Sequence, residues 1–168
     1  NETLTIVEAI TQVFGADQVK CPLNAGFDDS LHYKLDIENA AESSDVIILC
    51  LGENAYAESP GVIDDLNLPK NQVKLALDAI ATGKPVILVL VEGRGRLVSQ
   101  FVEDIDAVLL ALRPGSQGAM AIARTLAGLS NPSGLLPFTY HRSTGDLIPY
   151  DHRFSSKITQ GPPGTFTE

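Results

Sequence analysis

The sequence is poor in basic residues. Only 12 Lys and Arg stand against 21 Asp and Glu, the formal net charge is −9, and the basic residues are scattered along the chain. Nucleic acids and anionic membrane surfaces are bound through grouped cationic side chains, so this balance argues against both as the main partner. The sequence also has no run approaching the roughly 20 apolar residues of a membrane-spanning helix, and no basic-then-apolar signal segment at its start.

Cysteine is scarce as well. Cys21 and Cys50 are the only two in the chain, and each lies in or beside an apolar run that is typical of a buried strand. An unpaired cysteine in such a place packs as a small hydrophobic side chain. We therefore expect two buried thiols rather than a disulfide.

Several common motifs for cofactors and metals are missing. The sequence has no Walker A motif, and Gly93 and Gly95 are not followed by the third glycine of a dinucleotide-binding loop. His32, His141 and His152 lie far apart, without the paired spacing of zinc ligands. We therefore expect neither a cofactor nor a metal site.

What the sequence does contain is an alternation of strand and helix patterns. Wholly apolar runs predict buried strands of a parallel sheet at 46–52, 85–91 and 107–112. Helical spacing is found at 3–14, 33–44, 71–82, 97–104 and 116–129, and shorter strands are predicted at 19–23 and 136–140. This alternation is typical of right-handed βαβ units. It predicts an α/β fold with a doubly wound, mostly parallel sheet flanked by helices on both faces, a three-layer α/β/α sandwich.

The two ends of the chain depart from this pattern. The chain opens on a helix, whereas such folds usually open on a central strand, so we expect the first strand of the sheet to be missing. The last residues are rich in Pro, Gly, Ser and Thr, a composition typical of linkers. The predicted domain is thus 1–153, with a linker or tail at 154–168.

The loop after Gly52 is the richest place for chemistry. Ligands of open α/β sheets bind beyond the carboxyl ends of the strands, and residues 53–65 hold four carboxylates and a tyrosine there. Loops of this kind usually have two to six residues, and longer ones tend to be functional. Glu53 and Glu58 could carry out acid/base chemistry or bind calcium, although their spacing is not that of a calcium-binding helix–loop–helix. A plain acidic surface loop fits the composition equally well.

An ordered set of short motifs resembles the C-terminal α/β sandwich domain of family 3 glycoside hydrolases, which include β-glucosidases and exo-β-glucanases. The motifs are Gly52-Glu53, Tyr56-Ala57-Glu58, Asp65–Leu68, Gly83–Val86, Glu92–Arg94, Pro114–Gly118, Asn131–Pro137 and Pro149–His152. Each piece is short, and it is their common order over about residues 45–153 that is specific to the family.

The resemblance implies a retaining glycosidase that hydrolyses terminal, non-reducing β-linked sugars, with β-glucose as the first candidate. Its nucleophile is an aspartate on a preceding (β/α)8 barrel domain of the same polypeptide, absent from this sequence. Glu58, in the Tyr-Ala-Glu motif, matches the general acid/base, and Glu53 is the second candidate. Tyr56, Asp64 and Arg94 are expected at the substrate cleft.

The resemblance has further consequences and some departures. It implies a soluble periplasmic or extracellular enzyme, and a chain that is inactive without the barrel. The stretch from Ser59 to Asp64 is longer than in the family's commonest form, and Gly95 stands where proline is frequent. Arg94 and Arg96 fit either a hydrogen bond to a sugar or an interdomain carboxylate, or a simple salt bridge. The alternative function is a stand-alone flavodoxin-like binding or interaction module, whose acidic loop holds a cation or a partner.

Overall fold

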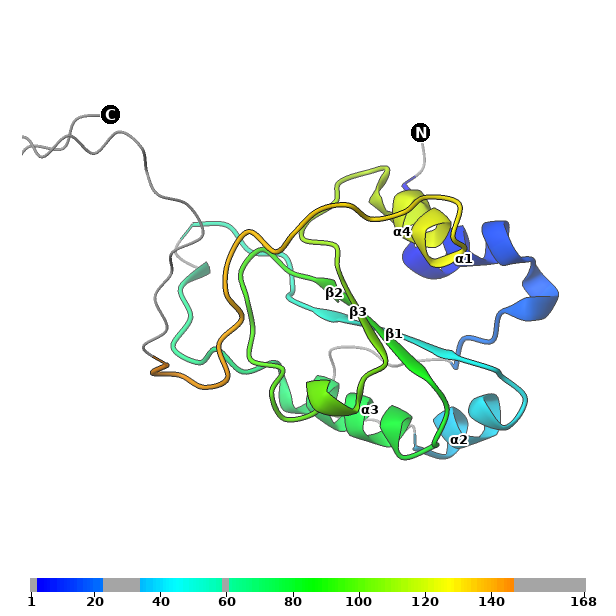
Figure 1. Cartoon of the computed structure of the whole chain (residues 1–168), viewed down its shortest axis with the longest axis horizontal. Helices are drawn as coiled ribbons and strands as arrows, with labels where there is room; N and C mark the ends of the chain where they lie inside the picture. Colours follow the sequence, from blue (N-terminus) through cyan, green and yellow to red (C-terminus); the bar gives the residue numbers. More distant parts are fainter. Residues whose placement is uncertain (1–2, 23–33, 59–60, 147–168) are drawn as a thin grey trace, which may run out of the picture.

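A parallel three-stranded sheet lies at the centre of the molecule. The computed structural model describes residues 3–22, 34–58 and 61–146. The strands β1 (Ile47–Gly52), β2 (Val86–Val91) and β3 (Ala107–Leu110) pair in the order β1-β2-β3. The helices α1 (Ile6–Phe14) and α4 (Gly118–Leu126) cover one face, and α2 (Lys34–Glu42) and α3 (Lys70–Ile80) cover the other (Figure 1). The predicted α/β fold, with a parallel sheet between two helical layers, is confirmed.

The core is built around the central strand. In β2, Val86, Leu88, Val89 and Leu90 are at most 1% exposed, and burial of each such side chain contributes roughly 1.5–3 kcal/mol to folding. On the side of α3, Val86, Leu88 and Leu90 pack with β1 residues and with residues that follow β2, such as Phe101. A smaller cluster joins α1 and α4 over the opposite face. The prediction that all three strands are wholly buried is wrong for β1 and β3, which are edge strands in the described sheet, and β2 comes nearest to it, with four of its six residues buried and the other two partly buried.

The position of β1 at the edge of the described sheet also explains why its cysteine, Cys50, is exposed. Side chains alternate between the faces of a strand, and Leu49 and Leu51 of β1 are buried on the side of α3. Ile48, on the other face, packs against the α1–α4 cluster, whereas Cys50 is exposed. Cys21 is exposed as well, and both thiols are free. The prediction of two buried thiols is therefore wrong, while the expected absence of a disulfide between them agrees with the structure.

Three shorter predicted elements are not formed. Residues 19–22 are not a strand, and their last residue, Pro22, has no N–H to donate to a ladder. Residues 136–140 also form no strand, because this segment is attached through the side chain of Tyr140 instead. The predicted helix at 97–104 is reduced to the 3₁₀ turn η3 (Val102–Asp104), since the Leu97 N–H bonds to Leu66 O at 2.9 Å. A further 3₁₀ turn, η1 (Ala16–Gln18), follows α1.

Some predictions fall on residues that the structure does not describe. Leu23, His32, His152, the 149–152 motif and the tail at 154–168 lie outside the described residues. The domain boundary at 153 and the missing first strand stay predictions. Among the helices that are described, none has the length and apolar character needed to cross a bilayer.

A glutamine of α3 fixes the point at which the chain leaves the sheet. Gly52 ends β1, and a Cβ atom there would lie 1.9 Å from Val91 O, so the close pairing of the two strands requires glycine. The side chain of Gln72, which is 5% exposed, accepts a hydrogen bond from Gly52 N at 2.9 Å and donates one to Gly52 O at 3.0 Å. The loop beyond Gly52 therefore starts from a fully hydrogen-bonded position.

Replacement of Gln72 by leucine should destabilise the chain by about 2–4 kcal/mol. The change leaves a buried N–H and a buried C=O without partners, and each such group costs roughly 1–3 kcal/mol. Urea unfolding followed by circular dichroism measures the loss. Leu77→Gln, at a position of the same helix that is 47% exposed, is the control and should change stability by no more than about 0.5 kcal/mol. A Gln72→Leu variant as stable as the parent chain would contradict this role.

Candidate active site

The loop between β1 and α3 is held at its base by one carboxylate. The side chain of Glu53 is 2% exposed, and its Oε1 lies 2.8 Å from Arg94 Nε and 2.8 Å from Arg96 Nε. Its Oε2 accepts a hydrogen bond from Gly93 N at 3.1 Å and lies 3.8 Å from Arg113 Nη2. Of the roles left open for Arg94 and Arg96 by the sequence, the structure shows the salt bridge.

These contacts determine the ionisation of Glu53. Burial by itself raises the pKa of the carboxyl, but the hydrogen bonds from Arg94, Gly93 and Arg96 outweigh it and hold the pKa below its ordinary value. Glu53 is therefore favoured as an anion, and its carboxylate accepts three hydrogen bonds inside the domain. Such a group is a poor proton donor for catalysis.

The same arginines continue into the backbone of the loop. Each guanidinium that contacts Glu53 also donates to loop carbonyl groups, so the loop is attached at several points along its length. The bonds run from Arg94 to Gly61, from Arg96 to Asp65 (2.7 Å) and Asn67 (3.4 Å), and from Arg113 to Asn54 (3.3 Å). Sequence reasoning missed Arg113, although its place just after the predicted third strand put it at the same edge of the sheet as Glu53.

Tyr56 lies in the middle of this cluster. The Cζ atoms of Arg94 and Arg113 lie over its ring, 4.1 and 4.4 Å from the centroid, in the geometry of cation–π contacts. The ring also touches the loop backbone closely, since a Cβ atom at Gly61 would lie 2.8 Å from Tyr56 Cδ2. Gly93 also lies close to the ring, since a Cβ atom there would be 2.6 Å from the Tyr56 hydroxyl oxygen.

Glu58 has a different environment from Glu53. Its side chain is exposed, and among the described residues no hydrogen bond or ion pair of its carboxylate is found. Its backbone is in the left-handed region with φ of 51°, which costs a non-glycine residue roughly 1–2 kcal/mol. Gly61 N donates to the Glu58 carbonyl oxygen at 2.8 Å. Backbone strain of this kind persists where the surroundings enforce it and is concentrated at functional sites.

The predicted site residues thus fall into two groups. The structure brings Glu53, Tyr56 and Arg94 together at the base of the loop, while Glu58 and Asp64 are exposed. Within the part of the chain that the structure describes, no three His, Cys, Asp or Glu side chains are grouped to hold a metal ion. The expected contacts of Tyr56, Asp64 and Arg94 with substrate stay predictions.

A buried carboxylate to which the sequence assigned no role of its own is in contact with this cluster. Glu92 follows β2 and is 0% exposed. Its Oε1 accepts hydrogen bonds from the Tyr140 hydroxyl and, at 3.4 Å, from Arg96 N, while its Oε2 has no partner in the described structure. Burial raises the pKa of Glu92, and the nearby charge of Glu53 raises it further, against the lowering effect of the two hydrogen bonds.

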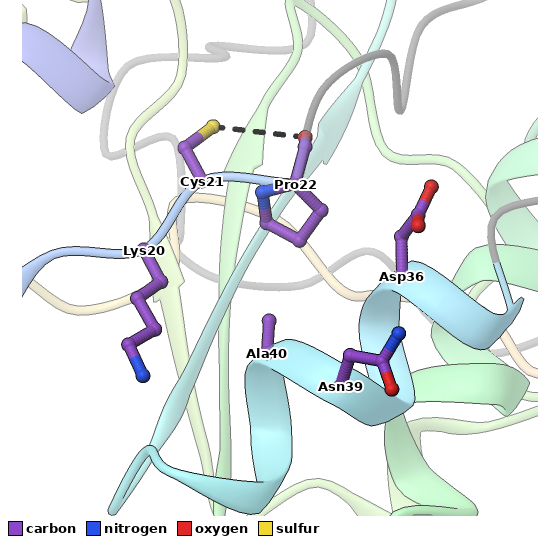
Figure 2. A pocket seen from close by; sticks show the side chains of 6 residues that line it. All are labelled: Lys20, Cys21, Pro22, Asp36, Asn39 and Ala40. Carbon is purple, nitrogen blue, oxygen red and sulfur yellow. Dashed lines mark hydrogen bonds between the residues drawn. The ribbon is translucent and has the colours of Figure 1, made fainter.

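A hollow elsewhere on the molecule holds none of the predicted site residues. It has a volume of about 460 Å³ and is lined by Lys20, Cys21, Pro22, Asp36, Asn39 and Ala40 (Figure 2). It lies between the segment after η1 and the helix α2. The candidate active site is therefore the loop after β1 and not this hollow.

Glu53→Gln should destabilise the chain at neutral pH by about 1–2 kcal/mol. This is less than the cost of breaking a fully buried pair, because Arg94 and Arg113 are partly open to water. Since the folded pKa of Glu53 is lowered, its stabilising effect is present at neutral pH and disappears as the pH falls through that lowered value. Urea unfolding at a series of pH values measures the difference. Glu103→Gln, whose side chain is 82% exposed, is the matched control; a difference for Glu53→Gln that did not shrink in acid would argue against the ion cluster.

Glu92→Gln should show the opposite dependence on pH. Because the folded pKa of Glu92 is raised, the native carboxyl is favoured at acid pH, and its contribution is lost as the pH rises through the raised value. The glutamine variant lacks this loss, so its stability relative to the parent chain should increase from acid to neutral pH. The same titration of unfolding free energy tests this, and a flat difference would contradict the burial of an ionisable group at this position.

Comparison with known proteins identifies the family of the chain. The family model described as "Glycosyl hydrolase family 3 C-terminal domain" matches residues 1–168. A "Lysosomal beta glucosidase" of Dictyostelium discoideum is 48% identical over 124 residues, which are 73% of this chain and 15% of the relative. A "Periplasmic beta-glucosidase" of Salmonella typhimurium is 36% identical over 115 residues, covering 67% of this chain and 15% of that protein.

A solved structure agrees in fold. The β-glucosidase of Listeria innocua in complex with glucose superimposes with a TM-score of 0.63 and 34% identity over 68% of this chain and 16% of that one. The chain thus spans about 15% of the length of the curated relatives it matches. Because the family model covers the whole chain and the first of these relatives is 48% identical, the chain belongs to the family of C-terminal domains of family 3 glycosyl hydrolases.

Proposed function

We propose that this chain supplies the general acid/base of a retaining β-glycosidase and that Glu58 is that residue. The observation that carries the proposal is the contrast between two glutamates of one loop. Glu53 is buried against three arginines and holds no proton to give, whereas Glu58 is exposed, unpaired within the described structure and in a strained left-handed conformation. A residue that must act on a sugar held by another domain requires that exposure.

The chemistry needs a second carboxylate from outside this chain. A retaining pair has its carboxyl groups about 5–5.5 Å apart, and we assign the nucleophile to an aspartate on a preceding (β/α)8 barrel domain of the same polypeptide. The small share of each relative that this chain spans, 15%, supports the presence of further domains in those proteins. Glu53 does not fit the role, since its carboxylate is already bound inside the domain.

The two steps assign opposite tasks to Glu58. In the first, the aspartate attacks the anomeric carbon, the glycosidic C–O bond breaks, and Glu58 gives its proton to the departing oxygen. In the second, Glu58 as a carboxylate takes a proton from water, the water oxygen bonds to the anomeric carbon, and the aspartate is released. The proton gained in the second step restores the acid form for the next cycle.

The names of the relatives support the choice of substrate and compartment. We propose a terminal, non-reducing β-linked glucose as the substrate, because the three proteins described above are named β-glucosidases, with xylose as the second candidate, since other relatives are named β-xylosidases. We also propose a site of action outside the cytosol, since the two relatives are named lysosomal and periplasmic. Tyr56, Asp64 and Arg94 border the proposed cleft, with Asp64 exposed on the same loop as Glu58.

Glu58→Gln in the complete enzyme should slow substrates with poor leaving groups by roughly 10²–10⁴-fold, the usual contribution of general acid catalysis. Aryl glucosides with acidic phenols need little protonation, so their kcat/KM should fall far less. Steady-state kinetics on p-nitrophenyl and alkyl β-glucosides measures the two effects. Glu103→Gln, an exposed Glu on the same domain, should leave both unchanged. Equal slowing of both substrate types by Glu58→Gln would show that this residue is not the acid.

The purified chain by itself separates this proposal from the alternative of a stand-alone binding module. If the nucleophile lies on another domain, the chain alone should not hydrolyse p-nitrophenyl β-glucoside, while the complete enzyme should. Turnover by the isolated chain that depends on protein concentration would contradict the division of the site. A complete polypeptide with no further domain would favour the binding module.

A further inference from the structure

Tyr56 is bound at a place from which it can control the backbone of Glu58. It precedes Glu58 by two residues, and its ring has cation–π contacts with Arg94 and Arg113. Both arginines also contact Glu53, so the ring rests on side chains that are themselves fixed by a buried carboxylate. The ring is therefore the part of the loop nearest to Glu58 that is firmly attached to the domain.

The chain on the other side of Glu58 is attached to the same arginine. Arg94 Nη1 donates to Gly61 O, and Gly61 N donates to the Glu58 carbonyl oxygen at 2.8 Å. The Tyr56 ring also packs on Gly61 so closely that a Cβ atom there would be 2.8 Å from the ring. Tyr56, Arg94 and Gly61 thus form one contact group that the chain leaves just before Glu58 and rejoins just after it.

This arrangement explains how an exposed residue keeps an unfavourable backbone conformation. Glu58 has no side-chain partner in the described structure, so nothing at its own side chain opposes relaxation out of the left-handed region. The restraint has to come from its neighbours in the chain, and strained residues persist only where the surroundings over-determine them. The ring of Tyr56 lies before Glu58 in the chain and packs on Gly61 after it, and it also contacts Arg94 and Arg113. It therefore connects both flanks of Glu58 to the arginine cluster.

We propose that Tyr56 is a positioning residue, whose ring, held by Arg94 and Arg113, sets the direction in which Glu58 presents its carboxyl group. This inference rests on the proposed function of Glu58 as the acid/base. The contacts that it requires are made by the π-face of the ring. The hydroxyl group is not needed for them, and phenylalanine should replace tyrosine at this position while an aliphatic side chain should not.

The test measures how kcat/KM of the complete enzyme depends on the leaving group. A series of aryl and alkyl β-glucosides gives the slope of log kcat/KM against leaving-group pKa, which becomes steeper when proton donation fails. We expect Tyr56→Leu to steepen this slope, with a 10- to 100-fold loss on alkyl glucosides and less than a threefold loss on p-nitrophenyl glucoside. Tyr56→Phe should keep the parent slope. A proportional loss on all substrates, or the same slope change in Tyr56→Phe, would overturn the proposal.

A matched control and a second variant distinguish the expected effect from a general loss of structure. Val73→Ala creates a cavity in the core beside α3 and should lower the melting temperature without changing the slope. Should Tyr56→Leu fail to fold, Arg113→Gln carries the test, because Arg113 is 43% exposed and its loss removes one contact to the ring. It should steepen the slope by a smaller amount, and an unchanged slope would overturn the positioning role.

The outcomes also separate this inference from the function on which it rests. If Glu58→Gln leaves the slope unchanged, the acid/base assignment fails, whatever Tyr56 does. If Glu58→Gln steepens the slope while Tyr56→Leu only raises KM equally for all substrates, the assignment stands and Tyr56 is a sugar contact instead of a positioning residue.

Discussion

The carboxylate of Glu53 is the group on which the geometry of the loop depends. Removing one partner from a buried charge cluster is costly, because the remaining charges lose their compensation. Here three guanidinium groups share one carboxylate, and each continues to a carbonyl of the loop. A long connection with little regular structure thereby acquires a fixed base without a helix or strand of its own.

The parallel sheet is what brings this cluster together. Gly52 at the end of β1 pairs with Val91, and Leu90 pairs with Leu110 near the end of β3. Glu53, Arg94 and Arg113 follow these paired strand ends, so residues far apart in the chain meet at the carboxyl end of the sheet. This is the end at which open α/β folds bind their ligands. The fold thus determines where the guanidinium groups lie, and their shared contact with Glu53 holds them against the carbonyl groups of the loop.

The sequence predicted much of this architecture and part of the site. The apolar runs located all three strands, because continuous apolar stretches are typical of the strands of a parallel sheet, although β1 and β3 are less buried than predicted. The length and acidity of the loop after β1 made it the candidate site, and its role stays a prediction. The same runs failed at residues 19–22 and 136–140 because apolar character does not specify a pairing partner, and Tyr140 makes its contact through a side chain. Arg113 was missed since its partner, Glu53, is distant in sequence, and Glu92 because nothing in the sequence distinguishes a buried carboxylate from a surface one.

Two glutamates five residues apart have been given opposite properties by their surroundings, which is how one loop can serve both anchoring and proposed chemistry. An acid that acts on a substrate of another domain must be free of partners in its own, because any internal donor would compete with the sugar oxygen for the carboxyl group. Freedom alone would leave it without a defined direction. The arginine cluster resolves this conflict by fixing the backbone on both sides of Glu58 while leaving its side chain unbound. The longer stretch after Glu58 is compatible with this arrangement, since added loop length costs little entropy once both flanks are attached.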